Sequence, residues 1–366
     1  MASTHDRRAP NASTMTEGDG HGNQGVTVAV VNPASGSAIS EEELRTAFDG
    51  LGRRIEWRET TEDDPGAGQA ADAVAFGATT VVACGGDGTV RACLAPLAGT
   101  DTVLGIVPLG TGNLLAANLG LPLGLDAVEP AVTGPIRRID LAEVNGESFA
   151  VMAGSGFDAL MIRDANATTK RRFGSLAYVA SAVRNLPTRL VSTTVEVDGT
   201  TVFDGRTAMV LIGNCGVVTG GLEVFPDARP DDGILDVAVL SARSPIEWAS
   251  VLWRLVRRLP QRRNLVARHH GRTVTVRTAT PRPYELDGED RPPVLALEFT
   301  VRPGALRVRT GTQDDGGSDR GRTSGRIPAQ YKLQHVYTVG ASADAYSGLR
   351  WFPHAYPRTH ADLTSG

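Results

Sequence analysis

The order of strand-like and helical segments between residues 26 and 119 constrains the fold of this chain more than any other feature. The strand-like segments are VTVAVV (26–31), RIEWRE (54–59), TTVVAC (79–84) and TVLGIVP (102–108). Helical patterns follow them at about 40–48, 68–76, 89–97 and 112–119, and Ser40 with Glu43 forms a capping box at the start of the first. Strands that alternate with helices predict a parallel sheet covered on both faces.

From about residue 137 the pattern changes to paired strands. Asn-Gly at 145–146 and Asp-Gly at 198–199 each separate two alternating segments, as in a β-hairpin. Further strand-like segments span 234–240, 272–277, 282–286 and 294–301, and helical patterns span 174–186 and 245–259. We expect an α/β domain over 25–136, a mainly antiparallel β domain over 137–310 and a ligand cleft between them. The flanking segments 1–24 and 311–366 lack a period, so we expect them to be poorly ordered.

Composition and charge exclude several classes of partner. The formal net charge of -4 gives no reason to expect a nucleic acid. The three cysteines, at 84, 93 and 215, have the spacing of neither a zinc site nor a disulfide scaffold. The chain has no run of 18 apolar residues and no secretory signal pattern, so we expect a cytoplasmic protein that contacts the inner face of the membrane only peripherally.

Glycine-containing turns follow three of the predicted strands. CGGDGTV (84–90) ends one strand and opens a helix, PLGTGN (108–113) does the same after the next, and NPASG (32–36) follows the first. Glycines let a backbone approach a phosphate closely, and a helix N-terminus offers free N–H groups to an anion. One such turn is more often structural. Three at one sheet edge favour a phosphate-binding site.

Asp87 narrows the nucleotide chemistry. A carboxylate among phosphates repels them unless a divalent cation lies between, so this residue predicts Mg²⁺ together with a nucleotide. A Walker loop needs a lysine, and no lysine occurs in the first 169 residues. The dinucleotide fingerprint G-x-G-x-x-G is missing from the first strand–helix turn, where NPASG stands. The predicted site is therefore of neither type.

These motifs, in this order and spacing, resemble the catalytic domain shared by diacylglycerol kinases, sphingosine kinases and bacterial lipid kinases. GSGFDA (154–159), the segment 213–237 and ELDGED (285–290) extend the resemblance to roughly residues 26–309. It implies an α/β nucleotide domain followed by a β-sandwich. It also implies an ATP- and Mg²⁺-dependent kinase that phosphorylates a hydroxyl of diacylglycerol or a related lipid. An NAD kinase, which shares GGDGT, and a nucleotide-binding regulator without catalysis are the alternatives.

The resemblance assigns roles by position. The ATP phosphate loop would consist of Gly85, Gly86, Asp87, Gly88, Thr89, Val90 and Arg91. Further nucleotide contacts are expected from Gly110, Thr111, Asn113, Asn32 and either Thr60 or Thr61. A structural Mg²⁺ would bind to the carboxylate of Asp232 and to the backbone carbonyls of Arg229 and Ile234. Glu289 would accept the proton of the lipid hydroxyl as general base, with Asp87 as the second catalytic residue.

Two positions depart from the family pattern. Many members carry Asn-Glu where this chain has Arg91-Ala92, and Asp where it has Leu114. The first change places a cation near the phosphates, which assists charge neutralisation. The second removes an acid from the surroundings of the metal. Both changes bear on substrate choice and metal binding more than on catalysis.

The segment 248–268, WASVLWRLVRRLPQRRNLVAR, combines an apolar helical face with five arginines between 254 and 263. It either packs on the core with a solvated basic side or lies at a membrane interface. His269 and His270 face opposite ways on any regular element, and we expect them at the surface. The expected partners are ATP and a lipid at the membrane surface. The pattern names neither the lipid nor the oligomeric state, a homodimer included.

Overall fold

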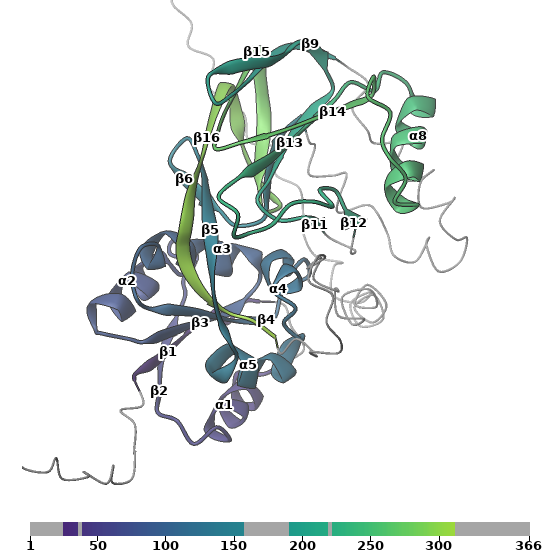
Figure 1. Ribbon diagram of the computed structural model, residues 1–366. Coiled ribbons are helices and arrows are strands. Elements are labelled where there is room, and N and C mark those ends of the chain that lie inside the picture. Colours follow the sequence, from purple (N-terminus) through teal and green to yellow (C-terminus); the bar gives the residue numbers. More distant parts are fainter. Residues whose placement is uncertain (1–24, 36–38, 157–189, 219–221, 312–366) are drawn as a thin grey trace, which may run out of the picture.

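The structure is a computed structural model that describes residues 25–35, 39–156, 190–218 and 222–311. Its first half contains parallel strands with helices between them (Figure 1). The strands are β1 (Thr27–Val31), β2 (Ile55–Glu59), β3 (Thr80–Gly85) and β4 (Val103–Pro108). The helices are α1 (Glu41–Asp49), α2 (Ala67–Ala75), α3 (Asp87–Leu97), α4 (Leu114–Asn118) and α5 (Val128–Thr133), with a 3₁₀ turn η1 (Gly124–Ala127).

The second half is mainly antiparallel. Its first strands are β5 (Ile136–Val144), β6 (Glu147–Phe149), β7 (Met152–Ser155), β8 (Val191–Val197), β9 (Thr200–Thr207) and β10 (Met209–Gly213). The later strands are β11 (Val217–Val218), β12 (Leu222–Glu223), β13 (Leu235–Leu240), β14 (Val266–Gly271), β15 (Thr273–Leu286) and β16 (Glu289–Arg309). Among the described residues of this half, helix α8 (Pro245–Val256) lies beside the sheet (Figure 1).

One hydrogen-bonded sheet connects the two halves. The strand order is β14-β13-β10-β7-β15-β16-β4-β3-β1-β2, with β5, β6, β8 and β9 paired off this path. The long strand β16 pairs with β15 in the second half and ends parallel to β4 in the first, where Arg307 lies opposite Val103. Figure 1 shows β5 and β16 running together from one half into the other. The chain therefore returns to its first half after completing the second.

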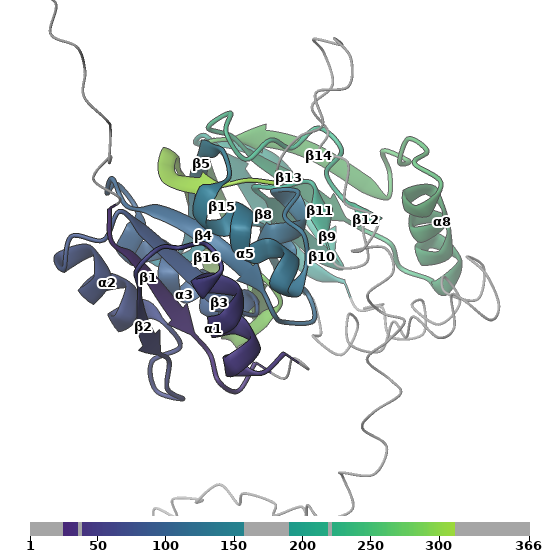
Figure 2. The same ribbon diagram turned by 90° about the horizontal axis from the view of Figure 1, so that it is seen from below.

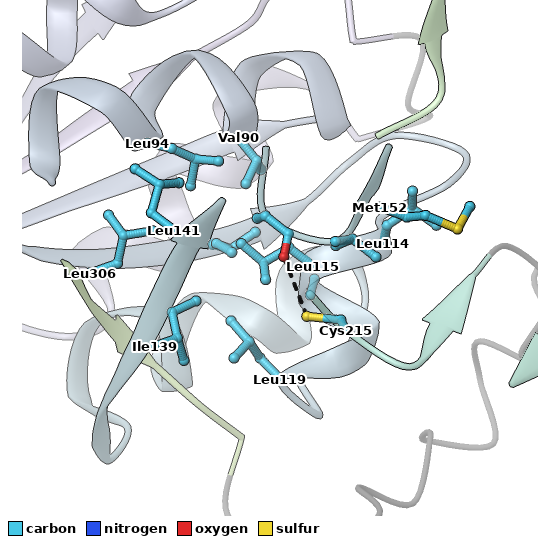
Figure 3. Packing of buried hydrophobic residues seen from close by; sticks show 14 of the residues in the cluster. Val90, Leu94, Leu114, Leu115, Leu119, Ile139, Leu141, Met152, Cys215 and Leu306 are labelled. Carbon is cyan, nitrogen blue, oxygen red and sulfur yellow. Dashed lines mark hydrogen bonds between the residues drawn. The ribbon is translucent and has the colours of Figure 1, made fainter. Parts of the chain in front are cut away.

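Helices cover both faces of the parallel strands, as Figure 2 shows from below. Val28 and Val30 of β1 lie in the cluster that includes α2, α3 and α4, whereas Ala29 and Val31 lie in the cluster that includes α1 and α5. Figure 3 shows the first cluster extending across the junction, because Leu115 of α4, Ile139 of β5 and Leu306 of β16 belong to it. A separate apolar cluster fills the antiparallel half.

The predicted fold class is confirmed, and so are several local predictions. Ser40 and Glu43 form the capping box of α1, and positive φ angles at both residues of each turn support the hairpins at 145–146 and 198–199. The segments 272–277 and 282–286 were expected as two strands but form one strand, β15. A register shift between Arg277 and Arg282 accommodates the prolines between and beside them.

Some predictions concern residues outside the described part of the chain. These are the tails 1–24 and 312–366, Gly36, the helix at 174–186 and the end of GSGFDA. The short helix α5 and the strand β14 were not predicted. On β14 His270 is exposed, whereas His269 is half-buried. Within the described residues, no helix is both long and apolar enough to cross a membrane.

Candidate active site

The two central glycine turns touch each other at the carboxyl ends of β3 and β4. A Cβ atom added to Gly110 would lie 2.5 Å from the Cα atom of Gly86. Glycine is therefore required where the two backbones cross. Gly86 is the N-cap of α3, and the first intrahelical bond is donated by the N–H of Val90 to the Gly86 carbonyl. The N–H groups of the first turn of α3 are consequently available to an anion.

Asp87 ties the first glycine turn to the second. Its carboxylate accepts hydrogen bonds from the N–H groups of Asn113, at 2.7 Å, and Leu114, at 2.6 Å, at the start of α4. Burial raises the pKa of Asp87 to about 6, although these two N–H groups act in the opposite direction. A carboxylate has about four lone-pair positions, so two accepted bonds leave capacity for a cation. The side chain thus combines a structural tie with a position at the sheet edge that was predicted to bind phosphate.

The remaining turn residues divide into those that shape the loops and those that stay available. Asn113 adopts a left-handed conformation and forms two side-chain hydrogen bonds with the backbone of Gly110. Asn32 donates to the hydroxyl of Thr89 at 3.3 Å, which joins the first turn to α3. Thr111 is exposed at the tip of the second turn, where its hydroxyl can contact a ligand.

Of the two threonines after β2, Thr61 shapes a local turn, whereas Thr60 stays available to a ligand. The hydroxyl of Thr61 accepts a hydrogen bond from the N–H of Asp64 at 3.1 Å, so it closes a local turn. Thr60 is 8% exposed and its hydroxyl forms no hydrogen bond with the described residues. Thr60 is therefore the better placed of the two for a nucleotide contact. The side chain of Val90 packs in the core, so its contribution to the phosphate loop is limited to its backbone.

The turn between β15 and β16 is held by a buried carboxylate. Asp287 accepts hydrogen bonds from three consecutive N–H groups, those of Ala150, Val151 and Met152, at 2.9, 3.0 and 2.9 Å. Burial raises its pKa, whereas the three N–H groups lower it. Asp287 and Gly288 both have positive φ, as a tight hairpin turn requires. This anchoring fixes the position of the next side chain, Glu289.

Glu289 reaches across from the second half to the first glycine turn. A Cβ atom added to Gly88 would lie 2.6 Å from Oε1 of Glu289, so the carboxylate rests on the first turn of α3. Arg91 of α3 donates a hydrogen bond to Oε2 of Glu289. The structure therefore brings together the two predicted catalytic regions, which are about 200 residues apart in sequence.

Two charged residues near Glu289 were not predicted. Arg291 lies 3.4 Å from Oε2 of Glu289 and donates from Nε to Glu147 at 2.7 Å. Glu147 also lies 3.9 Å from Arg91. Alternation along β16 places Arg291 on the same face as Glu289, which is the only signal that the sequence offered.

A third unpredicted charged residue, Glu285, is 2% exposed and forms no hydrogen bond with the described residues. It lies opposite Gly154 and Asp290 in the sheet. Burial raises its pKa to about 7, and the charges of Asp290 and Asp287 act in the same direction. Its neighbours in sequence, Tyr284 and Leu286, point into the apolar cluster of the antiparallel half.

The segment predicted to hold a structural metal is anchored by another buried acid. Asp140 of β5 accepts hydrogen bonds from the N–H groups of Gly233, at 2.6 Å, and Gly304, at 2.7 Å, and is 1% exposed. Asp232 is exposed, accepts a hydrogen bond from the N–H of Ile234 at 3.0 Å, and has its pKa raised by partial burial. Among the described residues, no three Asp, Glu, His or Cys side chains form a metal site by themselves.

Two family models match the chain and divide it near residue 150. The diacylglycerol kinase catalytic domain matches residues 27–144. The YegS C-terminal NAD kinase beta sandwich-like domain matches residues 151–310. The first match includes both central glycine turns, and the second includes the turn that carries Glu289.

Relatives and a solved structure agree with these matches. A Pseudomonas fluorescens protein named probable lipid kinase YegS-like is 33% identical over 281 residues, which are 75% of this chain and 92% of that protein. The diacylglycerol kinase of Bacillus subtilis is 30% identical over 61% of this chain and 76% of its own. A crystal structure of a diacylglycerol kinase from Bacillus anthracis superposes with a TM-score of 0.60 at 18% identity, covering 79% of this chain and 97% of that one, which shows the shared fold.

Proposed function

Since this chain belongs to the diacylglycerol kinase catalytic domain family of lipid kinases, we propose that it transfers the γ-phosphate of ATP to a lipid hydroxyl with the help of Mg²⁺. Diacylglycerol or a related lipid is the acceptor. The observation that carries this proposal is the position of the Glu289 carboxylate against Gly88. This position supports the proposal, because a carboxylate from one half of the molecule lies against the glycine turn of the other.

The donor set at the glycine turns fits a nucleotide-bound Mg²⁺. Magnesium is usually bound through one or two carboxylates together with substrate phosphates, so the absence of a larger acidic cluster among the described residues is no obstacle. Asp87 supplies the carboxylate, and when bound the ion neutralises phosphate charge. At the second site, the Asp232 carboxylate with the carbonyls of Arg229 and Ile234 offers the oxygen ligands that this cation prefers.

The chain's own residues position the phosphates and move the proton. The free N–H groups at the start of α3 and the Arg91 guanidinium face the phosphates, and Thr111 and Thr60 contact the rest of the nucleotide. The lipid hydroxyl oxygen attacks the γ-phosphorus, the bond to the β–γ bridging oxygen breaks, and ADP leaves. The hydroxyl proton passes to Glu289. Positioning and charge neutralisation supply most of the catalysis in such a transfer.

A lipid acceptor requires contact with a membrane surface, and the region of α8 is suited to it. Ile246 is 83% exposed at the start of α8, and Leu259 is 46% exposed just beyond its end. Arg262 and Arg263 are exposed in the segment that follows. Trp248 is 2% exposed, so one face of α8 packs on the core while the basic end is solvated. This arrangement supports peripheral binding to an anionic membrane from the cytoplasmic side.

The test is a labelling experiment with γ-³²P-ATP and Mg²⁺. Purified protein is incubated in parallel with diacylglycerol, ceramide, sphingosine, phosphatidylglycerol and NAD, and with a total lipid extract. We expect label in a lipid, with diacylglycerol or a related lipid as acceptor. Label in NAD alone would favour an NAD kinase, and nucleotide binding without transfer to any acceptor would favour a regulator.

Membrane contact is tested separately by sedimentation with anionic vesicles. The double charge reversal Arg262→Glu and Arg263→Glu should weaken vesicle binding. The matched reversal Arg53→Glu and Arg54→Glu, in the other half of the molecule, should not. If both double variants bind vesicles equally well, the basic end of α8 is solvated surface without a role in membrane binding.

A further inference from the structure

Arg91 has an unusual position for a residue at a phosphate site. It lies one turn into α3, its side chain is 16% exposed, and its guanidinium is hydrogen-bonded to Glu289. Its Nε atom is buried and has no hydrogen-bond partner among the described residues. A buried donor without a partner is costly, so this placement of the guanidinium does not satisfy the side chain completely.

The carboxylate of Glu289 is more exposed than the guanidinium of Arg91 and has a second cationic neighbour. Its side chain is 40% exposed, and besides Arg91 it lies 3.4 Å from Nη1 of Arg291. Arg291 is itself fixed by Glu147 at 2.7 Å, and the Tyr284 hydroxyl lies 3.3 Å from the other oxygen of Glu147. Glu289 therefore keeps a cationic neighbour on its own strand if Arg91 moves away.

We propose that Arg91 exchanges between two partners, binding Glu289 in the nucleotide-free protein and the γ-phosphate when ATP is bound. The exchange rests on the proposed function. In it, nucleotide binding withdraws the strongest ion-pair partner of Glu289 and so frees the carboxylate to accept a proton. Glu147 and Arg291 are positioning residues, because they hold Glu289 against Gly88 after Arg91 has left.

The physical reason for the exchange is competition for one cation. The guanidinium can satisfy a carboxylate or a phosphate through a bidentate pair, and the more highly charged phosphate is the stronger partner. In the free protein Arg91 also screens Glu289 and Glu147 from each other. Its contact with Glu289 must be given up when it pairs with the phosphate, so Glu289 opposes nucleotide binding for as long as Arg91 is present.

The competing arrangement is a bridge, in which Arg91 contacts Glu289 and the phosphate at the same time. The two arrangements predict opposite couplings. In the exchange, removing the Glu289 charge tightens nucleotide binding mainly because Arg91 no longer has a partner to leave. In the bridge, removing that charge matters more when Arg91 is absent, because nothing then screens the carboxylate from the phosphate.

The experiment is a double-mutant cycle read out by calorimetric binding of Mg²⁺ with a non-hydrolysable ATP analogue. We expect Glu289→Gln to tighten binding by roughly fivefold in the presence of Arg91, as loss of a partly exposed ion pair allows. In the Arg91→Gln background, the effect of Glu289→Gln should be smaller, because only the direct repulsion between the carboxylate and the phosphate remains. The control pair is Arg277→Gln and Glu196→Gln, an exposed ion pair between β15 and β8, which should leave binding unchanged.

A second measurement tests the positioning pair. With dioleoylglycerol in mixed micelles, Arg291→Gln should lower kcat by about tenfold and leave the KM for ATP within about twofold, because it displaces Glu289 and not the nucleotide. Arg291→Lys should restore part of kcat. A change in KM for ATP without a change in kcat would contradict the assigned role.

The outcomes separate this inference from the proposed function. Wild-type protein that fails to bind the analogue would overturn the proposed function itself. Normal binding, with an effect of Glu289→Gln that is equal or larger in the Arg91→Gln background, would overturn the exchange and leave the kinase assignment intact.

Discussion

The two halves of the molecule bring their residues to the site in different ways. In the parallel half, Asn32, Thr60, Asp87 and Thr111 each lie within a few residues of a strand end, so sheet topology alone gathers them. In the antiparallel half, Glu289 depends on a hairpin turn that is tied by Asp287 to a backbone segment more than 130 residues earlier. The first arrangement is local and the second is long-range.

The acids of the two halves show that the role of a carboxylate depends on the groups that surround it. The segment 285–290 contains four acids. Asp287 is buried with three N–H donors, Glu285 is buried with no hydrogen bond to the described residues, Glu289 is paired with arginine, and Asp290 is exposed. In the parallel half, Asp87 combines a structural tie with a position at the turn proposed to bind phosphate.

The largest expected effect comes from Asp87→Asn, which tests whether this acid is more than a tie. An asparagine retains one oxygen for the N–H groups of α4 but lacks the charge that would face the proposed Mg²⁺. We expect kcat/KM for phosphate transfer to fall by about 10³-fold, similar to the loss of a main electrostatic contact. The melting temperature should fall as well, though less than for Asp287→Asn, because one of the two N–H groups then faces the amide NH₂ and loses its acceptor.

Asp64→Asn is the matched control for this prediction. Asp64 also accepts N–H groups at a helix start, those of Gly66 and Gly68 at the beginning of α2. It has no place in the proposed phosphate site, so its replacement should leave kcat/KM within about twofold. Equal losses of kcat/KM in the Asp87→Asn and Asp64→Asn variants would mean that Asp87 contributes only by holding the backbone N–H groups of α4.

The next prediction tests the long-range contact by which Asp287 holds the turn that carries Glu289. Asp287→Asn should lower the free energy of unfolding by about 3 kcal/mol, because one amide oxygen cannot satisfy three buried N–H groups. Asp290→Asn, three residues later in the same hairpin and exposed, should cost less than about 0.5 kcal/mol. Urea unfolding measures both. Similar values would show that the turn does not depend on its buried anchor.

The parallel half was predictable because its signals are local. Strand ends, glycine turns and the capping box at Ser40 are each contained in a few residues, and the structure has those that lie wholly within the described residues. The helix expected from about residue 89 starts at Asp87 instead, because Gly86 serves as its N-cap. The contact between Gly86 and Gly110 follows from the adjacency of β3 and β4.

The antiparallel half was less predictable because its important contacts join distant segments. Nothing near Asp140 indicates that it receives the N–H groups of Gly233 and Gly304, apart from the presence of an acid within an apolar strand. The role of Glu147 is equally hidden, because its partner Arg291 lies 144 residues later. The catalytic assignment of Glu289 came from family resemblance, since the turn alone resembles a solvated loop.

A smaller effect comes from Glu285, the buried acid without a hydrogen bond. Its pKa is raised from 4.5 to about 7, so the folded state favours the protonated form. The contribution of this group to stability is therefore complete below about pH 4.5 and is lost as the pH rises through 7. Glu285→Gln should stabilise the protein by about 2 kcal/mol at pH 8 and change little at pH 4.

Urea unfolding at the two pH values measures this difference. Glu298→Gln, at an exposed position of β16, is the control for removal of one negative charge and should change stability by less than about 0.5 kcal/mol at either pH. A Glu285→Gln variant that is destabilised at pH 8 would mean that the carboxylate has a cationic partner outside the described residues.

The smallest effect compares one helix start in each half. Ser40 and Glu43 cap α1 reciprocally, because each side chain accepts the backbone N–H of the other. Ser244 accepts the N–H of Glu247 at 3.3 Å, but the carboxylate of Glu247 bonds the N–H of Arg243 instead. Ser40→Ala should therefore cost about 1 kcal/mol and Ser244→Ala about half as much. Hydrogen exchange of the first-turn amides of α1 and α8 measures the two costs separately, and a larger loss in α8 would contradict the advantage assigned to the reciprocal cap.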